Sequence, residues 1–293
     1  MLLRQEHHYA NVNGQLLHYV ACGEGKLMLF VHGFPEFWYE WQDQLDEFGQ
    51  DHQAVALDMR GYNLSSKPAN VADYSAKHLV EDLRCLIEYL GHKTCILVAH
   101  DWGGAVAWSF AAKLPEYVEK LVIINAPHTA TFARELTHNP AQQAASQYML
   151  LFRMDKAERV LTENNYARLA AMLTGTGSSV DWLTEGEKQR YLIAWSHPGA
   201  VTGGLNYYRA SPLYPPTPED PGASAIQIDA ERVMVRVPTL VIWGDADNAL
   251  LPSLLDGLEQ YVPNLTLKRI ADGSHWVIHE QPELVNQYIR AFI

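Results

Sequence analysis

The sequence has few cysteines, few basic residues and no long apolar run. Its 293 residues include three cysteines, at positions 22, 85 and 95, and no Cys-x-x-Cys pair. So few cysteines provide no disulfide framework and are typical of reduced thiols. Only 22 Lys and Arg residues are present against 34 Asp and Glu residues, which gives a formal net charge of −12 at pH 7. This acidic balance argues against a nucleic acid or a membrane surface as a partner.

No segment approaches the roughly 20 apolar residues that a membrane-spanning helix needs. Residues 1–8 lack an apolar run long enough for a secretion signal, so the expected location is the cytoplasm. Gly175 and Gly177 interrupt a helical segment, but no lysine follows them as it would in a phosphate-binding loop. We therefore expect a plain loop there, and we expect no cofactor and no metal.

Short apolar runs alternate with amphipathic helical segments along most of the chain. The pair Asn13-Gly14 lies between two alternating segments and predicts a β-hairpin near the N-terminus. Strands that alternate with helices favour a mainly parallel, doubly wound sheet of the α/β class. The later predicted strands are 27–31, 53–58, 94–99, 118–124, 238–243 and 265–270. The predicted helices are 38–48, 75–90, the segment that opens with Ala105, 252–261 and the segment from 282.

The alternation stops after residue 126. Only helical segments are predicted there, among them 141–152 and 156–173, and a proline-rich connector follows them. We therefore divide the chain into an α/β core of residues 1–126 and 216–293 and an inserted helical cap of residues 127–215. Such a cap would lie over the carboxyl ends of the strands, where ligands bind in sheets of this kind.

The segment Ala99-His100-Asp101-Trp102-Gly103 joins a buried strand to a helix. Small residues two positions before and two positions after its centre allow the two backbones to approach closely. The central side chain then points out over the carboxyl end of the sheet, beside the next backbone N–H. This is the arrangement of a nucleophile elbow, with Asp101 where serine is usual. The alternative is an aspartate that only caps the helix.

A carboxylate at this position indicates substitution at saturated carbon. It is ionised at pH 7 and needs no base in order to attack. Displacement of a leaving group from sp³ carbon gives an alkyl ester, which water can cleave at the carbonyl of the enzyme. A serine would instead form an ether that water cannot cleave at the protein end. Asp101 therefore suggests hydrolysis of an epoxide or an alkyl halide.

An acid and a histidine follow Asp101 in the chain order that is usual for this architecture. Asp247 and His275 each lie in a loop directly after a predicted strand. His275 would activate water against the ester, and the acid would orient the imidazole. Asp245 is a competing acid. His32 and His100 flank the site and are expected to have structural roles with local hydrogen bonds, and His279 is expected to pack or to face water.

Five segments together resemble the epoxide hydrolases of the α/β-hydrolase fold. The resemblance runs through nearly the whole chain, and it implies this fold with a helical cap and the conversion of an epoxide to a diol. The segments are His32-Gly33-Phe34-Pro35, Arg60-Gly61-Tyr62, His100-Asp101-Trp102-Gly103-Gly104, Asn206-Tyr207-Tyr208-Arg209 and Gly273-Ser274-His275-Trp276.

The resemblance also implies roles for individual residues. The backbone N–H groups of Phe34 and Trp102 would form the oxyanion hole. Tyr208, in an Asn-aromatic-Tyr-Arg motif, and Tyr148, in the first cap helix, would donate hydrogen bonds to the epoxide oxygen, although the neighbours of Tyr148 depart from the usual pattern. The Gly-x-x-Asp spacing of the family favours Asp247 as the acid. The implied reactants are a small hydrophobic epoxide and water.

Two other functions remain open at this point. Haloalkane dehalogenases share the Asp-Trp elbow, but many of them hold the halide with an Asn after the His-Gly pair, where this chain has Phe34. A non-catalytic small-molecule receptor of the same fold is less favoured, because every catalytic role can be assigned. The physiological epoxide and the oligomeric state have no signature in the sequence. Six cap residues suggest an apolar cavity: Met149, Leu150, Phe152, Met172, Trp182 and Trp195.

Overall fold

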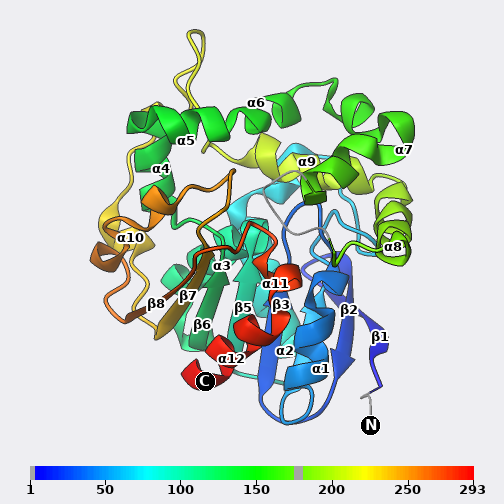
Figure 1. Cartoon of the computed structure of the whole chain (residues 1–293). Helices are drawn as coiled ribbons and strands as arrows, with labels where there is room; N and C mark the ends of the chain where they lie inside the picture. The colour runs from blue at the N-terminus through cyan, green and yellow to red at the C-terminus, as the bar shows by residue number, and fades with distance from the viewer. Residues whose placement is uncertain (1–3, 175–180) are drawn as a thin grey trace.

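One sheet of eight strands, in the order β1-β2-β4-β3-β5-β6-β7-β8, organises the protein (Figure 1). The computed structural model describes residues 4–174 and 181–293. β1 and β2 form the hairpin predicted at Asn13-Gly14, and β2 pairs antiparallel with β4. The remaining pairings in the described chain are parallel. The strands are β1 Glu6–Val12, β2 Gln15–Cys22, β3 Leu27–Val31, β4 Gln53–Leu57, β5 Cys95–His100, β6 Val118–Ile124, β7 Thr239–Gly244 and β8 Leu265–Ile270.

Helices cover both faces of this sheet. The central strands β3 and β5 are buried along their whole length, because apolar side chains on both sides need cover on both sides. In Figure 1, α1 and α12 lie in front of the sheet and α2 and α3 behind it. The predicted doubly wound, mainly parallel sheet is therefore confirmed. The helices outside the cap are α1 Gln42–Phe48, α2 Ala76–Tyr89, α3 Asp101–Lys113, α10 Ala230–Val233, α11 Val277–Glu280 and α12 Pro282–Phe292.

The inserted block consists of helices, and no strand occurs among its described residues. Figure 1 shows these helices lying together over one edge of the sheet, beyond the strand ends. The division into a core domain and a cap domain at the stated boundaries stays a prediction. The helices are α4 Thr129–His138, α5 Pro140–Ala145, α6 Gln147–Arg153, α7 Ala157–Thr174, α8 Glu185–Ser196 and α9 Ala200–Ala210.

The predicted helix 252–261 is wrong. The segment forms two short 3₁₀ turns, η5 Pro252–Leu255 and η6 Leu258–Gln260. Gly257 between them has a φ of +74°, a left-handed conformation that glycine adopts at low cost and that interrupts a helix. The predicted helix 38–48 also begins as a 3₁₀ turn, η1 Trp38–Trp41, before α1.

Two predicted cap helices are interrupted. The segment 141–152 is divided between α5 and α6, which are separated at Ser146. In α7, residues Glu163–Tyr166 leave the helical conformation, and three of them have positive φ values of 52°, 55° and 61°. α7 therefore consists of two helical pieces joined by a kink. The loop predicted at Gly175 and Gly177 lies outside the described residues.

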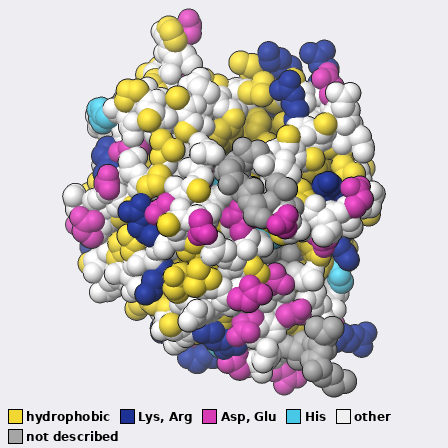
Figure 2. Space-filling model, in the orientation of Figure 1, with side chains coloured by type: hydrophobic (Ala, Val, Ile, Leu, Met, Phe, Trp, Pro, Cys, Tyr) yellow, Lys and Arg dark blue, Asp and Glu magenta, His cyan; other side chains and the backbone are white. Residues whose placement is uncertain are grey.

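Within the described residues, no helix combines the length and the apolar character needed to cross a bilayer. The three cysteines carry free thiols. Figure 2 shows acidic and basic side chains interspersed over one face of the molecule.

Candidate active site

Asp101 lies at the turn from β5 into α3. Its φ of +48° is left-handed, which is uncommon for a residue other than glycine and typical of a constrained site. Gly103 is required by the turn, because a Cβ atom there would lie 2.2 Å from the carbonyl oxygen of Val31. A Cβ atom at Gly33 would lie 2.3 Å from the Asp101 side chain. The turn thus has the close approach that a nucleophile elbow demands.

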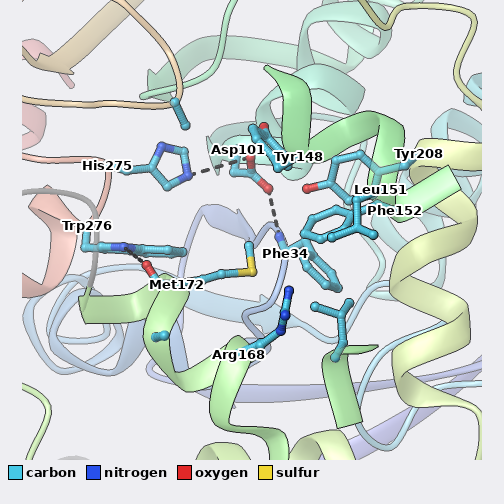
Figure 3. A pocket seen from close by; sticks show the side chains of 13 residues that line it. Phe34, Asp101, Tyr148, Leu151, Phe152, Arg168, Met172, Tyr208, His275 and Trp276 are labelled. Atoms are coloured by element: carbon cyan, nitrogen blue, oxygen red, sulfur yellow. Dashed lines mark hydrogen bonds and ion pairs between the residues drawn. The ribbon is translucent and has the colours of Figure 1, made fainter. Parts of the chain in front are cut away.

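The carboxylate of Asp101 has two partners (Figure 3). The N–H of Phe34 donates to Oδ1 at 2.7 Å, and Nε2 of His275 lies 3.6 Å from Oδ2. The side chain of Asp101 keeps 13% of its surface exposed, so a ligand in the cavity can reach it. The loop after β3 therefore lies against Asp101, as the oxyanion-hole hypothesis requires. Trp102 follows Asp101 directly at the start of α3, and the role of its N–H stays a prediction.

Asp247 and His275 are brought together by the loops after β7 and β8. Nδ1 of His275 donates to Oδ2 of Asp247 at 2.7 Å. The other oxygen, Oδ1, accepts from the N–H groups of Ala249 and Leu250 at 2.8 and 2.9 Å. Nδ2 of Asn125, at the end of β6, donates to Oδ2 at 2.9 Å. These bonds fix the carboxylate, which in turn fixes the imidazole ring.

The competing acid, Asp245, points elsewhere. Its carboxylate pairs with Arg269 at 2.9 Å near the surface, and 22% of its side chain is exposed. The side chain of Asp247, by contrast, is fully buried against His275. Only Asp247 of the two is placed to orient the imidazole.

The carboxylates of Asp247 and Asp101 lie beside His275, and burial and these two charges change its pKa. Burial alone would lower the pKa of His275, but the carboxylates of Asp247 and Asp101 outweigh burial and raise this pKa to about 9. Burial would raise the pKa of Asp247, yet the neighbouring imidazole and the hydrogen bonds hold it below its ordinary value. At neutral pH the site therefore contains an imidazolium between two carboxylates.

Two cap tyrosines share a cavity with Asp101. Tyr208 belongs to α9 and Tyr148 to α6, and their ring centroids lie 6.1 Å apart. Figure 3 shows the hydroxyl of Tyr208 directed toward Asp101. Burial raises the pKa of Tyr148, and the charge of Asp101 adds to the effect. Burial likewise raises the pKa of Tyr208, with smaller contributions from Tyr148 and Asp101. Both phenols therefore stay protonated at neutral pH and can donate.

The cavity has a volume of about 430 Å³ and mostly apolar walls. Of the six cap residues selected from the sequence, Phe152 and Met172 line it, and Met149 lines a smaller adjoining cavity of about 70 Å³. The other three line neither cavity. Further apolar lining residues are Phe34, Leu151, Leu161 and Trp276.

His32 and His100 are buried behind the site. Both ring nitrogens of His32 form hydrogen bonds with backbone: Nδ1 donates to the Gly33 carbonyl at 2.8 Å, and Nε2 accepts from the Met59 N–H at 3.0 Å. These contacts agree with the structural role that was expected. His100 differs from the expectation of local hydrogen bonds. Its Nε2 lies 2.9 Å from the carbonyl oxygen of His275, and its Nδ1 lies 2.5 Å from Oε1 of Glu40.

The hydrogen-bond partners of His100 indicate whether the carboxyl of Glu40 is protonated. A carbonyl oxygen only accepts, so Nε2 of His100 donates to His275. Burial lowers the pKa of His100 to about 3, so the ring is neutral and Nδ1 accepts. The carboxyl of Glu40 must then be the donor. Burial, and next the charge of Glu36, raise the pKa of Glu40 well above its ordinary value, in agreement with a protonated group.

Glu36, Glu40 and His279 form the one group of potential metal ligands within the described residues. Their ligand atoms lie within 4.8 Å of one another. However, Glu36 accepts from the hydroxyl of Tyr191 at 2.8 Å and pairs with His279 at 3.1 Å. Burial opposes protonation of His279, but Glu36 outweighs it and raises its pKa. Glu36 and His279 are already paired with each other and Tyr191 donates to Glu36, so we assign this group to packing. His279 also stacks on Trp182, with 12% of its side chain exposed, so it packs as one of the two expectations had it.

The chain matches known proteins along nearly its whole length. Residues 26–282 match the family described as "alpha/beta hydrolase fold". Epoxide hydrolase 4 of Mus musculus is 36% identical over 289 residues, which cover 96% of this chain and 77% of that protein.

Two solved structures of an epoxide hydrolase from Bacillus megaterium are also similar. The structure in complex with an inhibitor is 42% identical with a TM-score of 0.89, and the match covers 97% of this chain and 99% of that one. A point mutant, crystallised with its product (R)-3-[1]naphthyloxy-propane-1,2-diol, is 41% identical with the same TM-score and the same coverage. The chain therefore belongs to the α/β-hydrolase fold family and, within it, to the epoxide hydrolases.

Proposed function

We propose that the protein converts a hydrophobic epoxide into a vicinal diol through an alkyl ester of Asp101. One observation carries this proposal: the carboxylate of Asp101 and the phenols of Tyr208 and Tyr148 line one apolar cavity. Opening of an epoxide needs a nucleophile at carbon and a proton donor at oxygen. The naphthyloxy-propanediol bound to the Bacillus megaterium relative is a product of this type.

In the first step, a carboxylate oxygen of Asp101 attacks an epoxide carbon and the carbon–oxygen bond breaks. The freed oxygen takes a proton from Tyr208 or Tyr148. Both phenols have raised pKa values and are protonated before reaction, so each can supply that proton. No base takes part in this step.

In the second step, water attacks the carbonyl carbon of the ester and His275 removes its proton. The N–H groups of Phe34 and Trp102 stabilise the developing oxyanion. Collapse of the intermediate releases the diol and restores the Asp101 carboxylate. The proton on His275 then replaces the one that a tyrosine gave away.

A dehalogenase would require a donor for the departing halide beside the nucleophile. The residue after the His-Gly pair is Phe34, whose ring packs edge-on against Phe152 and Tyr208 at centroid distances of 5.4 and 5.5 Å. A phenyl ring offers no N–H there. The tyrosines would also be superfluous, since a halide leaves without a proton.

We also propose a core domain of residues 1–126 and 216–293, a cap domain of residues 127–215, and a cytoplasmic location, because free thiols are typical of reducing compartments.

The decisive experiment separates the two steps. His275→Gln, mixed with styrene oxide, should accumulate a covalent adduct of one substrate mass, and peptide mapping should place that adduct on Asp101. Asp101→Asn should form no adduct at early times. Wild-type protein should release diol from styrene oxide and little bromide from 1-bromohexane.

Two results would contradict the proposal. Efficient bromide release without diol would assign the chain to the dehalogenases. Turnover by His275→Gln without an adduct would mean that water attacks the epoxide directly, and the ester mechanism would have to be abandoned.

A further inference from the structure

The second piece of α7 supplies one wall of the main cavity. Arg168, Ala171 and Met172 line the cavity, and their spacing of three and four residues puts them on one face of the helix. The kink at Glu163–Tyr166 separates this piece from the first part of α7. Figure 3 shows the guanidinium of Arg168 directed into the cavity from the side opposite Asp101.

Arg168 is the one arginine without a partner among residues 4–174 and 181–293. Each of the other twelve has an ion pair, a hydrogen bond to backbone or an aromatic ring against its guanidinium. The chain carries 34 acidic residues, so carboxylates are abundant. An unpaired guanidinium beside an apolar cavity is therefore free to bind an anion from solution.

The cavity thus has charged groups at two places with apolar walls between them. Asp101 and His275 lie at the reacting end, and Arg168 lies where its exposed side chain reaches solvent. Phe34, Phe152 and Met172 line the space around them. A ligand that fits the reacting end, the apolar walls and the guanidinium has an epoxide at one end, an apolar arm, and an anionic group at the other end.

A guanidinium binds a carboxylate with two parallel hydrogen bonds. One guanidinium without a second cation beside it matches a single negative charge better than a phosphate dianion. We propose that Arg168 is an anion-binding residue and that it gives the protein a preference for epoxides carrying a carboxylate at the far end of an apolar arm. This inference rests on the proposed function for the reaction itself, and it adds the specificity of the cavity.

The test compares terminal epoxides of increasing chain length, each as the ω-carboxylate and as its methyl ester. The acid-to-ester ratio of kcat/KM should exceed one and pass through a maximum at one chain length, because the arm must span from Asp101 to Arg168. Arg168→Gln should lower that ratio about three- to tenfold through KM, as expected for a partly exposed charge pair. Arg168→Lys should retain part of the preference, and 0.5 M NaCl should weaken it.

Arg159→Gln is the matched control. Arg159 lies in the first piece of α7, pairs with Glu163 at the surface and does not line the cavity. This substitution should leave the acid-to-ester ratio unchanged. If the acid-to-ester ratio falls equally in both variants, the preference arises from the overall charge of the cap and the proposal is overturned. A ratio that Arg168→Gln leaves unchanged would overturn it as well.

A binding measurement separates this inference from the proposed reaction. Saturated carboxylates of the same chain lengths cannot react, and calorimetry should show that Arg168→Gln binds the best of them about three- to tenfold more weakly while binding of its methyl ester falls less. If wild-type protein hydrolyses neither epoxide, the proposed function fails and calorimetry still decides the role of Arg168. If diol forms but neither ratio depends on Arg168, only the anion-binding proposal fails.

Discussion

Replacement of Asp247 by Asn should slow the second half of the proposed reaction strongly and leave the first half nearly intact. In the folded protein, Oδ1 of Asp247 accepts from the N–H groups of Ala249 and Leu250. The amide oxygen of the Asp247→Asn variant takes this position, so its NH₂ group faces His275. Nδ1 of His275 must then accept, and the ring proton moves to Nε2. An Nε2–H cannot remove a proton from water.

The size of the effect on ester hydrolysis follows from the free-energy cost of flipping the side-chain amide at position 247. If the amide flips so that its oxygen faces His275, the NH₂ group confronts the N–H donors of Ala249 and Leu250. Each unsatisfied donor costs about 1–3 kcal/mol. The unflipped amide also leaves one donor unsatisfied, because its NH₂ group faces Nδ2 of Asn125. The flip therefore costs a net of about 1–3 kcal/mol. At 1.36 kcal/mol per factor of ten, the active arrangement becomes about 5- to 160-fold rarer, with about 30-fold as the central value. Ester hydrolysis should slow by that factor.

Rapid mixing with one equivalent of epoxide, followed by intact-protein mass measurement, resolves the two steps. Asp247→Asn should form the ester at a rate near that of the wild type and should then hydrolyse it much more slowly. Asp245→Asn is the control, because Asp245 pairs with Arg269 and does not touch His275. Wild-type hydrolysis in Asp247→Asn, or an equal loss in both variants, would refute the tautomer reasoning.

Three further predictions concern the same centre. Tyr208→Phe or Tyr148→Phe alone should slow ester formation but leave activity, whereas the double variant should be nearly inactive in single-turnover assays; a fully active Tyr148→Phe across several epoxides would remove that residue from the site. The thermal stability of Glu40→Gln relative to wild type should increase as pH rises from 5 to 8. The reason is that a group whose pKa is raised in the folded state makes the wild-type protein less stable as pH rises above the ordinary pKa of that group. A stability difference that does not change with pH would mean that Glu40 is ionised in the folded protein. The single-turnover rate of ester hydrolysis should rise with pH and level off with a midpoint below 9, and a rate that falls as pH rises from 6 to 9 would exclude His275 as the base.

The sequence predicted what local spacing and chain order determine. Small residues on either side of Asp101 indicate the tight turn without any knowledge of distant contacts. Asp247 and His275 follow adjacent parallel strands, and the carboxyl ends of such strands meet at one edge of the sheet. The identity of the acid needed the family spacing in addition. Asp245 and Asp247 are only two residues apart, and their side chains have different surroundings in the fold.

Contacts between distant segments had no local signal. Asn125 reaches Asp247 across 122 positions, and Glu40 reaches His100 across 60. The break at Gly257 and the kink after Glu163 arise from left-handed φ values, which hydrophobic periodicity does not register. Arg168 gave no signal either, because its importance depends on which face of the kinked α7 meets the cavity.

The charges of the site make the second step of the proposed reaction depend on the first. In the free protein, His275 faces Asp247 at 2.7 Å and Asp101 at 3.6 Å, and both carboxylates raise its pKa. An imidazolium cannot accept a proton from water. Formation of the alkyl ester removes the charge of Asp101, while burial continues to lower the pKa of His275. That pKa therefore falls when the ester forms, and the base becomes available only while there is an ester to hydrolyse.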